Sequence, residues 1–210
     1  DEINRTSSKT QSALLEAMEE RQITVDGRTY PLEKPFVVIA TQNNVGTAGT
    51  QFLPYAQMDR FMVRLSVGYP DHDAQMALLR DRLSENPLDA VEQVLTREEL
   101  LAMQADVRAV QTGDALLDYI TRLTMASREH PNVEVGVSPR GALLLCRMAK
   151  ARAYLLGRAF AVSEDVQAVF EPVCAHRLIV SAKARLAGVR AGDVVRELLA
   201  DVPNPDRAAL

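Results

Sequence analysis

Polar side chains in this sequence follow an apolar stretch at the point where a strand is predicted to end. The stretch Phe36–Thr41 is continuously apolar until its last residue, and it leads into Gln42, Asn43 and Asn44. Open α/β sheets place ligand chemistry at the carboxyl ends of their strands, where a polar cluster can orient a water molecule or a phosphate. Asparagine also starts turns, because it accepts the left-handed conformation and bonds its own backbone. On spacing alone the turn is favoured, and a chemical role for Asn43 stays an alternative.

Two arginines stand at predicted helix ends. Arg60 closes a short helix that Pro54 begins, where the helix dipole favours a cation by about 0.3–1 kcal/mol, so a structural role is one interpretation. Arg140 follows Ser138 and Pro139, which suit the N-cap and the first helical position. A helix start that carries an arginine can bind a phosphate, and a solvated side chain is the alternative for Arg140.

Two carboxylates, Asp1 and Glu2, open the sequence ahead of a predicted helix over Lys9–Arg21, with Ser7 or Ser8 as its N-cap. Acids at this place ordinarily face solvent. By themselves these two side chains indicate no chemistry.

The elements that would position these side chains are two strands and a hairpin. A continuous apolar run such as 36–41 is typical of a strand covered on both faces, usually in a parallel sheet. Residues 61–69 alternate between apolar and other side chains, which predicts a strand with one apolar face. Two short β-prone segments around Asp26-Gly27 predict a hairpin with a type I′ turn. This hairpin could contact a partner or be a plain surface feature, and the sequence favours neither.

After Pro70 the sequence changes to helical segments with short polar joints. Start signals include the capping box from Thr96 to Glu99, the Ser138-Pro139 pair, and Ser163. We therefore predict an α/β part over 1–70 and an all-helical part over 71–210.

Composition limits the functional classes. The 210 residues are 47% hydrophobic and 25% charged, which is typical of a globular chain with a proper core. The net charge of −4 provides no overall basic field for nucleic acid. No apolar run is long enough to cross a bilayer, so we expect no membrane insertion. Cys146 and Cys174 lack metal-ligand spacing and indicate small core residues in a reducing compartment, so we expect a cytoplasmic protein.

Six longer strings together resemble the MoxR family of AAA+ ATPases, and the resemblance extends over the whole sequence. The strings are DEINR at 1–5, KTQSALLEAMEERQITVDG at 9–27, VIATQN at 38–43, AQMDRF at 56–61, VSPRGALLL at 137–145 and HRLIV at 176–180. The resemblance implies the C-terminal portion of an AAA+ P-loop α/β core, with parallel strands and an inserted β-hairpin, followed by a helical lid domain.

The resemblance also implies site residues for ATP and Mg²⁺. Asp1 and Glu2 match the Walker B acids: Asp1 would hold Mg²⁺ through its water shell, and Glu2 would polarise the attacking water. Asn43 matches sensor 1, which places that water. Arg60 matches the arginine finger that reaches the nucleotide of a neighbouring subunit, and such a finger contributes about 10³ to 10⁵ in rate. Arg140 matches sensor 2 of the lid.

Some residues depart from the family pattern. Asn44 replaces the usual proline after the sensor residue, the loop Val45–Gln51 lacks the usual acid, and Tyr55 replaces a usual glutamate. The sequence contains no G-x-x-x-x-G-K-[ST] phosphate loop. We therefore expect these residues to be the C-terminal part of an ATPase, inactive on their own.

The functional hypothesis from the resemblance is a Mg-ATP-hydrolysing subunit of a ring. A homo-hexamer is expected, with chaperone-like remodelling or maturation of partner proteins, including metal insertion. A von Willebrand A domain protein is the expected partner. One alternative is a nucleic-acid motor of the MCM-like type, which the negative charge disfavours. The other is a non-catalytic interaction module derived from an AAA+ ATPase.

Overall fold

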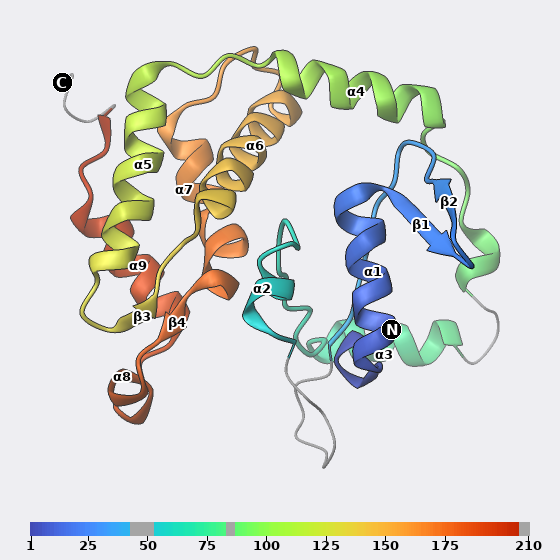
Figure 1. Cartoon of the computed structure of the whole chain (residues 1–210), viewed down its shortest axis with the longest axis horizontal. Helices are drawn as coiled ribbons and strands as arrows, with labels where there is room; N and C mark the ends of the chain where they lie inside the picture. The colour runs from blue at the N-terminus through green and yellow to red at the C-terminus, as the bar shows by residue number, and fades with distance from the viewer. Residues whose placement is uncertain (43–52, 83–86, 206–210) are drawn as a thin grey trace.

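The computed structural model describes residues 1–42, 53–82 and 87–205. Figure 1 shows a group of packed helices on one side, the N-terminal helix with a hairpin on the other, and the long helix α4 running between them along the top. No helix in the described ranges is both long enough and apolar enough to span a membrane.

The packed helices form the main hydrophobic core. Their bounds are α5 Asp114–Glu129, α6 Pro139–Leu155, α7 Ser163–Cys174, η3 Ala175–Arg177, α8 Ala182–Leu186 and α9 Ala191–Asp201. Helix α4 (Arg97–Ala109) leads into this group and has no buried residue. The central side chains Tyr119, Leu123, Leu145, Val166 and Phe170 have no exposed surface. Burying a large apolar side chain contributes about 1.5–3 kcal/mol, so this core can hold the helical part together.

The predicted helix starts are confirmed. Thr96 and Glu99 form a reciprocal capping box, in which the Glu99 carboxylate accepts from the Thr96 N–H at 2.7 Å. Ser138 Oγ accepts the N–H of Gly141 at 3.0 Å and so begins α6. Each cap satisfies a backbone donor that the helix itself leaves without a partner.

One carboxylate is completely buried among these helices. Asp165 accepts hydrogen bonds from Arg152 at 2.6 Å and from Arg158 at 2.6 and 2.8 Å. Burial alone would raise the pKa of Asp165, but these bonds and the N–H of Val162 hold it below its usual value. The buried charge is therefore compensated, and it fixes the last turn of α6 against the start of α7.

The N-terminal part contains η1 (Ile3–Arg5), α1 (Ser8–Glu20), and the antiparallel strands β1 (Gln22–Val25) and β2 (Arg28–Pro31). Asp26 and Gly27 have φ of 49° and 75°, as a type I′ turn requires, so the predicted hairpin is confirmed. Thr24 Oγ1 donates to Glu16 Oε1 at 2.5 Å, which ties the hairpin to α1.

The two predicted central strands are wrong as paired strands. Residues 36–41 and 61–69 contain no strand, and neither segment belongs to a sheet of the described residues. Val37, Ile39, Val67 and Tyr69 are between 63% and 100% exposed. A segment forms a strand only when its backbone is hydrogen-bonded to a neighbouring strand. The hydrophobic pattern of one segment does not show whether that neighbouring strand is present. The described sheets are the β1–β2 pair and the β3 (Val133–Val135) and β4 (Ile179–Val180) pair, both antiparallel.

Three short elements connect the two groups. They are α2 (Tyr55–Met58), α3 (His72–Arg82) and η2 (Pro87–Ala90). Asp71 Oδ1 accepts the N–H of Ala74 at 2.8 Å and so caps the start of α3. The side chains of α3 from His72 to Asp81 are exposed, so this helix lies outside the helical core. By contrast, α2 lies against η3 and brings Arg60 to the helical part.

Candidate functional site

The two opening acids lie beside the end of the extended segment 36–42. Thr41 Oγ1 donates a short hydrogen bond to Asp1 Oδ1 and accepts the N–H of Glu2 at 2.9 Å. The N–H of Ile3 donates to the Thr41 carbonyl at 3.0 Å. The structure therefore brings Asp1 and Glu2 next to Thr41, the residue that ends the apolar run.

Glu2 is held in the left-handed conformation, with φ of 46°, and its carboxylate accepts from Arg5 Nη1 at 2.7 Å. Asn43 lies outside the described residues. The last described residue of this segment is Gln42, whose Nε2 lies 3.9 Å from Met58 Sδ, so the segment leads from the acids to α2.

The acid pair suits a magnesium ion that is shared with a substrate. Mg²⁺ keeps several waters and is usually held by one or two carboxylates together with substrate phosphates. Asp1 is exposed and has a second carboxylate oxygen besides the one that accepts from Thr41. Within the described ranges, no group of three or more His, Cys, Asp and Glu residues could hold a metal by itself.

The two predicted arginines converge on one carboxylate. Arg60 Nη1 and Arg140 Nη1 both reach Oε1 of Glu19, at 2.6 and 2.7 Å. Arg140 Nη2 donates in addition to Glu19 Oε2 at 3.3 Å. Arg60 comes from the end of α2, Arg140 from the first turn of α6 and Glu19 from the last turn of α1. The sequence did not predict this role for Glu19.

A fully buried arginine fixes the residues next to Arg60. Arg177 donates from Nε to Asp59 Oδ1 at 3.0 Å, and from Nη2 to the carbonyls of Asp59 and Phe61 at 2.9 and 2.5 Å. Its Nη1 donates a short hydrogen bond to the carbonyl of Val173. Arg177 therefore caps the end of α2 with groups from the helical part. The sequence analysis missed it, although a charged residue in the apolar run 173–180 was a usable signal.

The same cluster reaches the start of α6. Ser138 Oγ donates to both carboxylate oxygens of Asp59, at 3.0 and 3.1 Å. A Cβ at Gly141 would lie 2.6 Å from Val137 Cγ1 and 2.8 Å from Arg177 Cδ, so glycine permits this close approach. Asp59 is thus bonded both to η3 and to the turn that carries Arg140. Arg60 and Arg140 are positioned by one connected set of contacts.

Tyr55, which departs from the family pattern, adds to this joint. Its hydroxyl donates to the Gly136 carbonyl at 3.4 Å. Burial first, and then the charge of Asp59, raises the pKa of the Tyr55 phenol, so it stays a donor. The substitution therefore gives α2 another contact with the helical part.

The acids and the arginines lie at different places along α1. Gln11 Nε2 donates to the Ile3 carbonyl at 3.4 Å, so the acid pair is level with the beginning of α1. Glu19 follows Gln11 by eight residues, which is about 12 Å at 1.5 Å per residue. Figure 1 shows the N-terminus beside the end of α1 opposite to the one that leads into β1. In this arrangement a single phosphate is not within reach of both the acids and the arginines.

His176 supplies a pH-dependent contribution to stability. The ring is buried, and Nε2 lies 2.7 Å from Arg177 Nη1 and 3.2 Å from the Phe61 carbonyl. Burial first, and then the charge of Arg177, lowers the pKa of His176 to about 4. Arg64 also lowers this pKa, while Asp59 and the Phe61 carbonyl raise it.

We expect the free energy of unfolding to fall as the pH drops from about 6.5 to about 4. Between these values the unfolded chain binds a proton at this imidazole and the folded chain does not, so the loss is roughly 3 kcal/mol. Urea denaturation at several pH values would measure it. His176→Gln should flatten the dependence and His72→Gln, at an exposed position, should not. An equal slope in the His176→Gln variant would contradict this origin.

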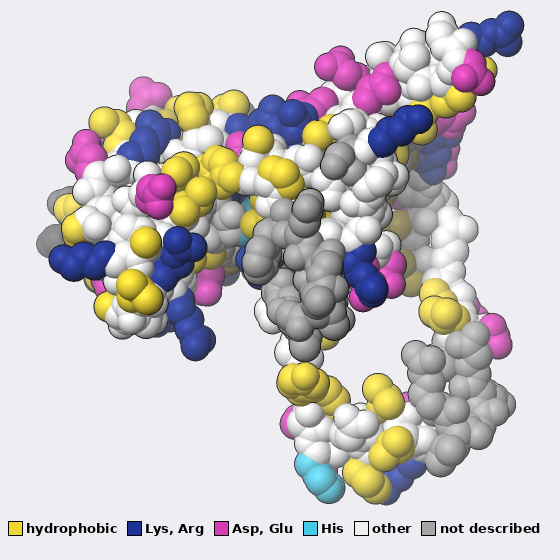
Figure 2. All heavy atoms as spheres, turned by 60° about the horizontal axis from the view of Figure 1, so that its bottom comes forward, with side chains coloured by type: hydrophobic (Ala, Val, Ile, Leu, Met, Phe, Trp, Pro, Cys, Tyr) yellow, Lys and Arg dark blue, Asp and Glu magenta, His cyan; other side chains and the backbone are white. Residues whose placement is uncertain are grey.

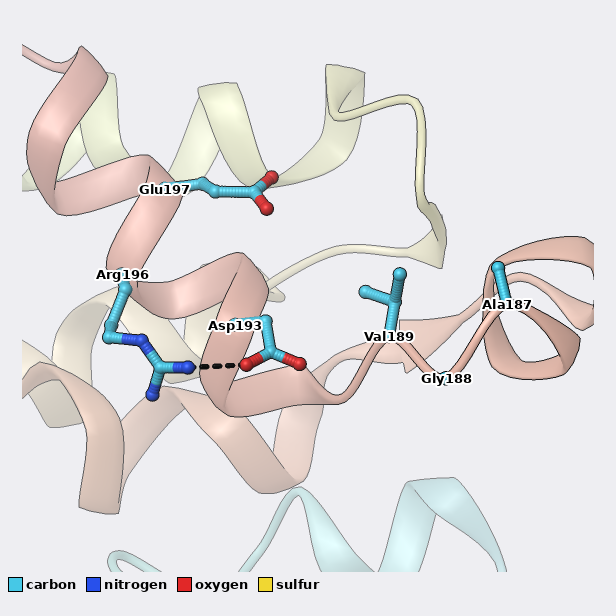
Figure 3. Close-up of a pocket in the computed structure, with 6 residues that line it drawn as sticks. All are labelled: Ala187, Gly188, Val189, Asp193, Arg196 and Glu197. Atoms are coloured by element: carbon cyan, nitrogen blue, oxygen red, sulfur yellow. Dashed lines mark hydrogen bonds and ion pairs between the residues drawn. The ribbon is translucent and has the colours of Figure 1, made fainter.

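Two hollows in the described surface lie away from the acid pair. Figure 3 shows one between α8 and α9, lined by Ala187, Gly188, Val189, Asp193, Arg196 and Glu197. Asp193 and Arg196 pair with each other inside it. A second hollow lies between 64–66 and the residues around His176. Among the described site residues, Asp1, Glu2, Arg60 and Arg140, none lines either hollow.

Comparison with known proteins gives two family matches. Residues 1–63 match the "ATPase family associated with various cellular activities (AAA)", and residues 125–198 match the "AAA lid domain". The first match contains Asp1, Glu2, Asn43 and Arg60, and the second contains Arg140. All five predicted site residues thus fall inside matched regions.

Individual relatives cover nearly the whole chain. The chain is 42% identical to protein YeaC of Bacillus subtilis over 98% of its length, and 35% identical to the chaperone MoxR1 of Mycobacterium tuberculosis over 98%. It is similar to the crystal structure of a proposed ATPase from Cytophaga hutchinsonii, with 34% identity, a TM-score of 0.91 and 97% of this chain covered. The chain spans 64% of YeaC, 56% of MoxR1 and 64% of the crystallised chain.

Proposed function

Because the chain belongs to the MoxR family of AAA+ ATPases, we propose that the full-length protein hydrolyses Mg-ATP at the interfaces between subunits of a ring. Hydrolysis would drive chaperone-like remodelling or maturation of a partner protein, including metal insertion. The name of the relative MoxR1 supports the chaperone role. A homo-hexamer, a cytoplasmic location and a von Willebrand A domain partner belong to the same proposal. Co-purification with the full-length protein would test the partner.

In this proposal Asp1 and Glu2 would bind the magnesium ion and orient the water that attacks the phosphate. Asp1 would hold the water shell of Mg²⁺, and Thr41, which donates to Asp1, would keep that carboxylate in place. The metal would neutralise phosphate charge when bound. Glu2 orients the attacking water and takes up its proton, for which its carboxylate must leave the solvent-exposed pair with Arg5. Asn43 would hold the same water.

In the same proposal the arginines stabilise the charge that develops on the phosphates. Arg60 would act as the finger and Arg140 as sensor 2, since guanidinium forks match phosphate oxygens. Because both bind Glu19, they would approach the phosphates from the same side.

The separation along α1 is the observation that carries the proposal of an interface. The α1 residues that mark the two groups, Gln11 beside the acids and Glu19 at the arginines, are about 12 Å apart along this helix, whereas both groups must act on one triphosphate. A second copy related by rotation around a ring can bring its arginines to the acids of the first. The proposed interface is therefore heterologous, with acids on one face of the subunit and arginines on the other.

Subunit mixing tests this arrangement in the full-length protein. Arg60→Ala subunits keep the acids and lose the finger, while Glu2→Gln subunits keep the finger and lose the acid. Each variant alone should be nearly inactive. Equal mixing should restore activity at about a quarter of the interfaces, where intact acids meet an intact finger. Turnover measured against the mixing ratio should pass through a maximum.

Native mass spectrometry would show that mixed rings form. If mixed rings form and turnover stays at the level of the two separate variants at every ratio, each subunit uses its own finger. The proposed interface would then be wrong.

The nucleic-acid motor gains no support from the surface. The net charge is −4, and Figure 2 shows Lys and Arg side chains interspersed with Asp and Glu on the face it presents. A uniform basic track, which would hold the phosphate backbone, is not seen on that face. The non-catalytic alternative is disfavoured because the acids and both arginines are present.

The hairpin is the contact that we propose for the partner or substrate. Ile23, Val25 and Tyr30 are 39–53% exposed at its surface. Deleting the hairpin tip should weaken partner binding and leave basal ATP hydrolysis in place, because no predicted site residue lies in it.

A further inference from the structure

We propose that Glu19 is a positioning residue, whose carboxylate holds Arg60 and Arg140 as one paired unit for a single phosphate chain. The inference rests on the proposed function, because it assumes that both guanidiniums act on the nucleotide of a neighbouring subunit. Neither the composition of the sequence nor its resemblance to known proteins assigns a role to Glu19.

The first support is the geometry of the pair. One carboxylate oxygen of Glu19 accepts from both arginines, at 2.6 and 2.7 Å, so two like charges lie next to each other. Without the carboxylate the guanidiniums would repel and separate. Glu19 neutralises only one of the two positive charges. The unit therefore keeps a net positive charge that can attract a phosphate.

The second support is the way in which Arg60 is held. Arg177 fixes the backbone on both sides of Arg60, and Glu19 binds the guanidinium through Nη1. No residue of the described part of the chain pairs with Arg60 Nη2, so its donors remain for a phosphate. Arginine has many rotamers. A guanidinium that is already held in place therefore loses less conformational entropy when it binds the phosphate. Glu19 thus preorganises the charge that meets the phosphate.

The third support is that helix stability does not explain an acid at this position. Glu19 lies in the last turn of α1, where the helix dipole disfavours a negative charge. The side chains of Glu19 and Arg140 are 34% and 42% exposed, and exposed ion pairs contribute little to stability. The presence of an acid at this position is therefore better explained by its ion pairs with Arg60 and Arg140 than by the stability of α1.

The test uses Glu19→Gln in the full-length protein, with Glu20→Gln as the matched control. Glu20 is the next residue of α1, is exposed, and undergoes the same change of charge. Glu19→Gln should lower kcat by about 10- to 100-fold, because a small misplacement of a catalytic group has an effect of this size. KM and the thermal midpoint should stay close to the starting values. Glu20→Gln should leave kcat unchanged.

Subunit mixing then locates the defect. Glu19→Gln subunits retain their acids, so Glu2→Gln subunits, which supply an intact arginine pair, should restore turnover. Arg60→Ala subunits should restore none, because both variants are defective on the same face.

Four results would overturn the role of Glu19: unchanged kcat, a thermal midpoint that falls in proportion to kcat, rescue by Arg60→Ala subunits, or no rescue by Glu2→Gln subunits. The last counts only if Arg60→Ala and Glu2→Gln subunits do rescue each other. Failure of that reference pair would instead contradict the proposed interface.

Discussion

Replacing Arg60 with alanine is expected to lower kcat for ATP hydrolysis by the full-length protein about 10³- to 10⁵-fold. The guanidinium would stabilise charge that exists only in the transition state, so its loss should appear in kcat far more than in KM. Steady-state turnover and equilibrium binding of a fluorescent ATP analogue would separate the two effects. Binding should change little, because in the proposed interface the acids and the nucleotide would belong to the neighbouring subunit.

Arg64→Ala is the matched control for this experiment. Arg64 lies four residues after Arg60 and is exposed, and its backbone N–H is bonded to the Pro172 carbonyl at 2.9 Å. It does not reach Glu19. Removal of its side chain should therefore change kcat by no more than a few fold. If Arg64→Ala lowers kcat as much as Arg60→Ala does, the finger has been assigned to the wrong residue.

Features with local causes were predicted correctly. The Asp26-Gly27 turn, the Thr96 capping box and the start of α6 at Ser138 each depend on a few neighbouring residues, and all three are confirmed. The predicted fold class, a portion of an AAA+ core followed by a helical lid, is supported by the family matches and by the close structural likeness. That success came from strings specific to a family, whereas composition and periodicity alone gave only an α/β part and a helical part.

The predicted strands failed because a strand depends on distant partners. Residues 36–41 have the pattern of a buried strand, yet Val37 and Ile39 are exposed here. The relatives are longer than this chain, and the neighbours that such a sheet needs are not among the described residues. The apolar pattern thus predicts a buried segment, but no described part of the chain covers Val37 and Ile39.

The site was predicted residue by residue, but its arrangement was not. The meeting of Arg140 with Glu19 joins positions 121 residues apart, and Arg177 meets Asp59 across 118 residues. No periodicity or spacing rule connects such positions, because the contacts arise only when α1, α2 and the helical part pack together. The resemblance names candidate side chains, and the structure adds which of the described ones share a location.

Arg177 gives the largest expected effect on stability. Its side chain has no exposed surface, and Asp59, its ion-pair partner, has a side chain that is 12% exposed. Removing one partner of a buried pair leaves a charge that the interior cannot solvate. The carbonyls of Asp59, Phe61 and Val173 would also lose a charged donor.

Arg177→Met, which keeps the length of the stem, is therefore expected to lower the free energy of unfolding by about 3–5 kcal/mol. Urea denaturation of the full-length protein would measure this, and Arg147→Met, at an exposed position on α6, should stay within about 0.5 kcal/mol of the starting protein. Asp59→Asn combined with Arg177→Met should recover part of the loss, since it removes the unpaired charge. A strictly additive pair of losses would mean that the two side chains do not act together. Arg177 also bonds to the carbonyls on both sides of Arg60. Losses that are not additive would therefore indicate that the Arg177–Asp59 pair, which joins the helical part to the segment carrying the proposed finger, stabilises the protein as a pair.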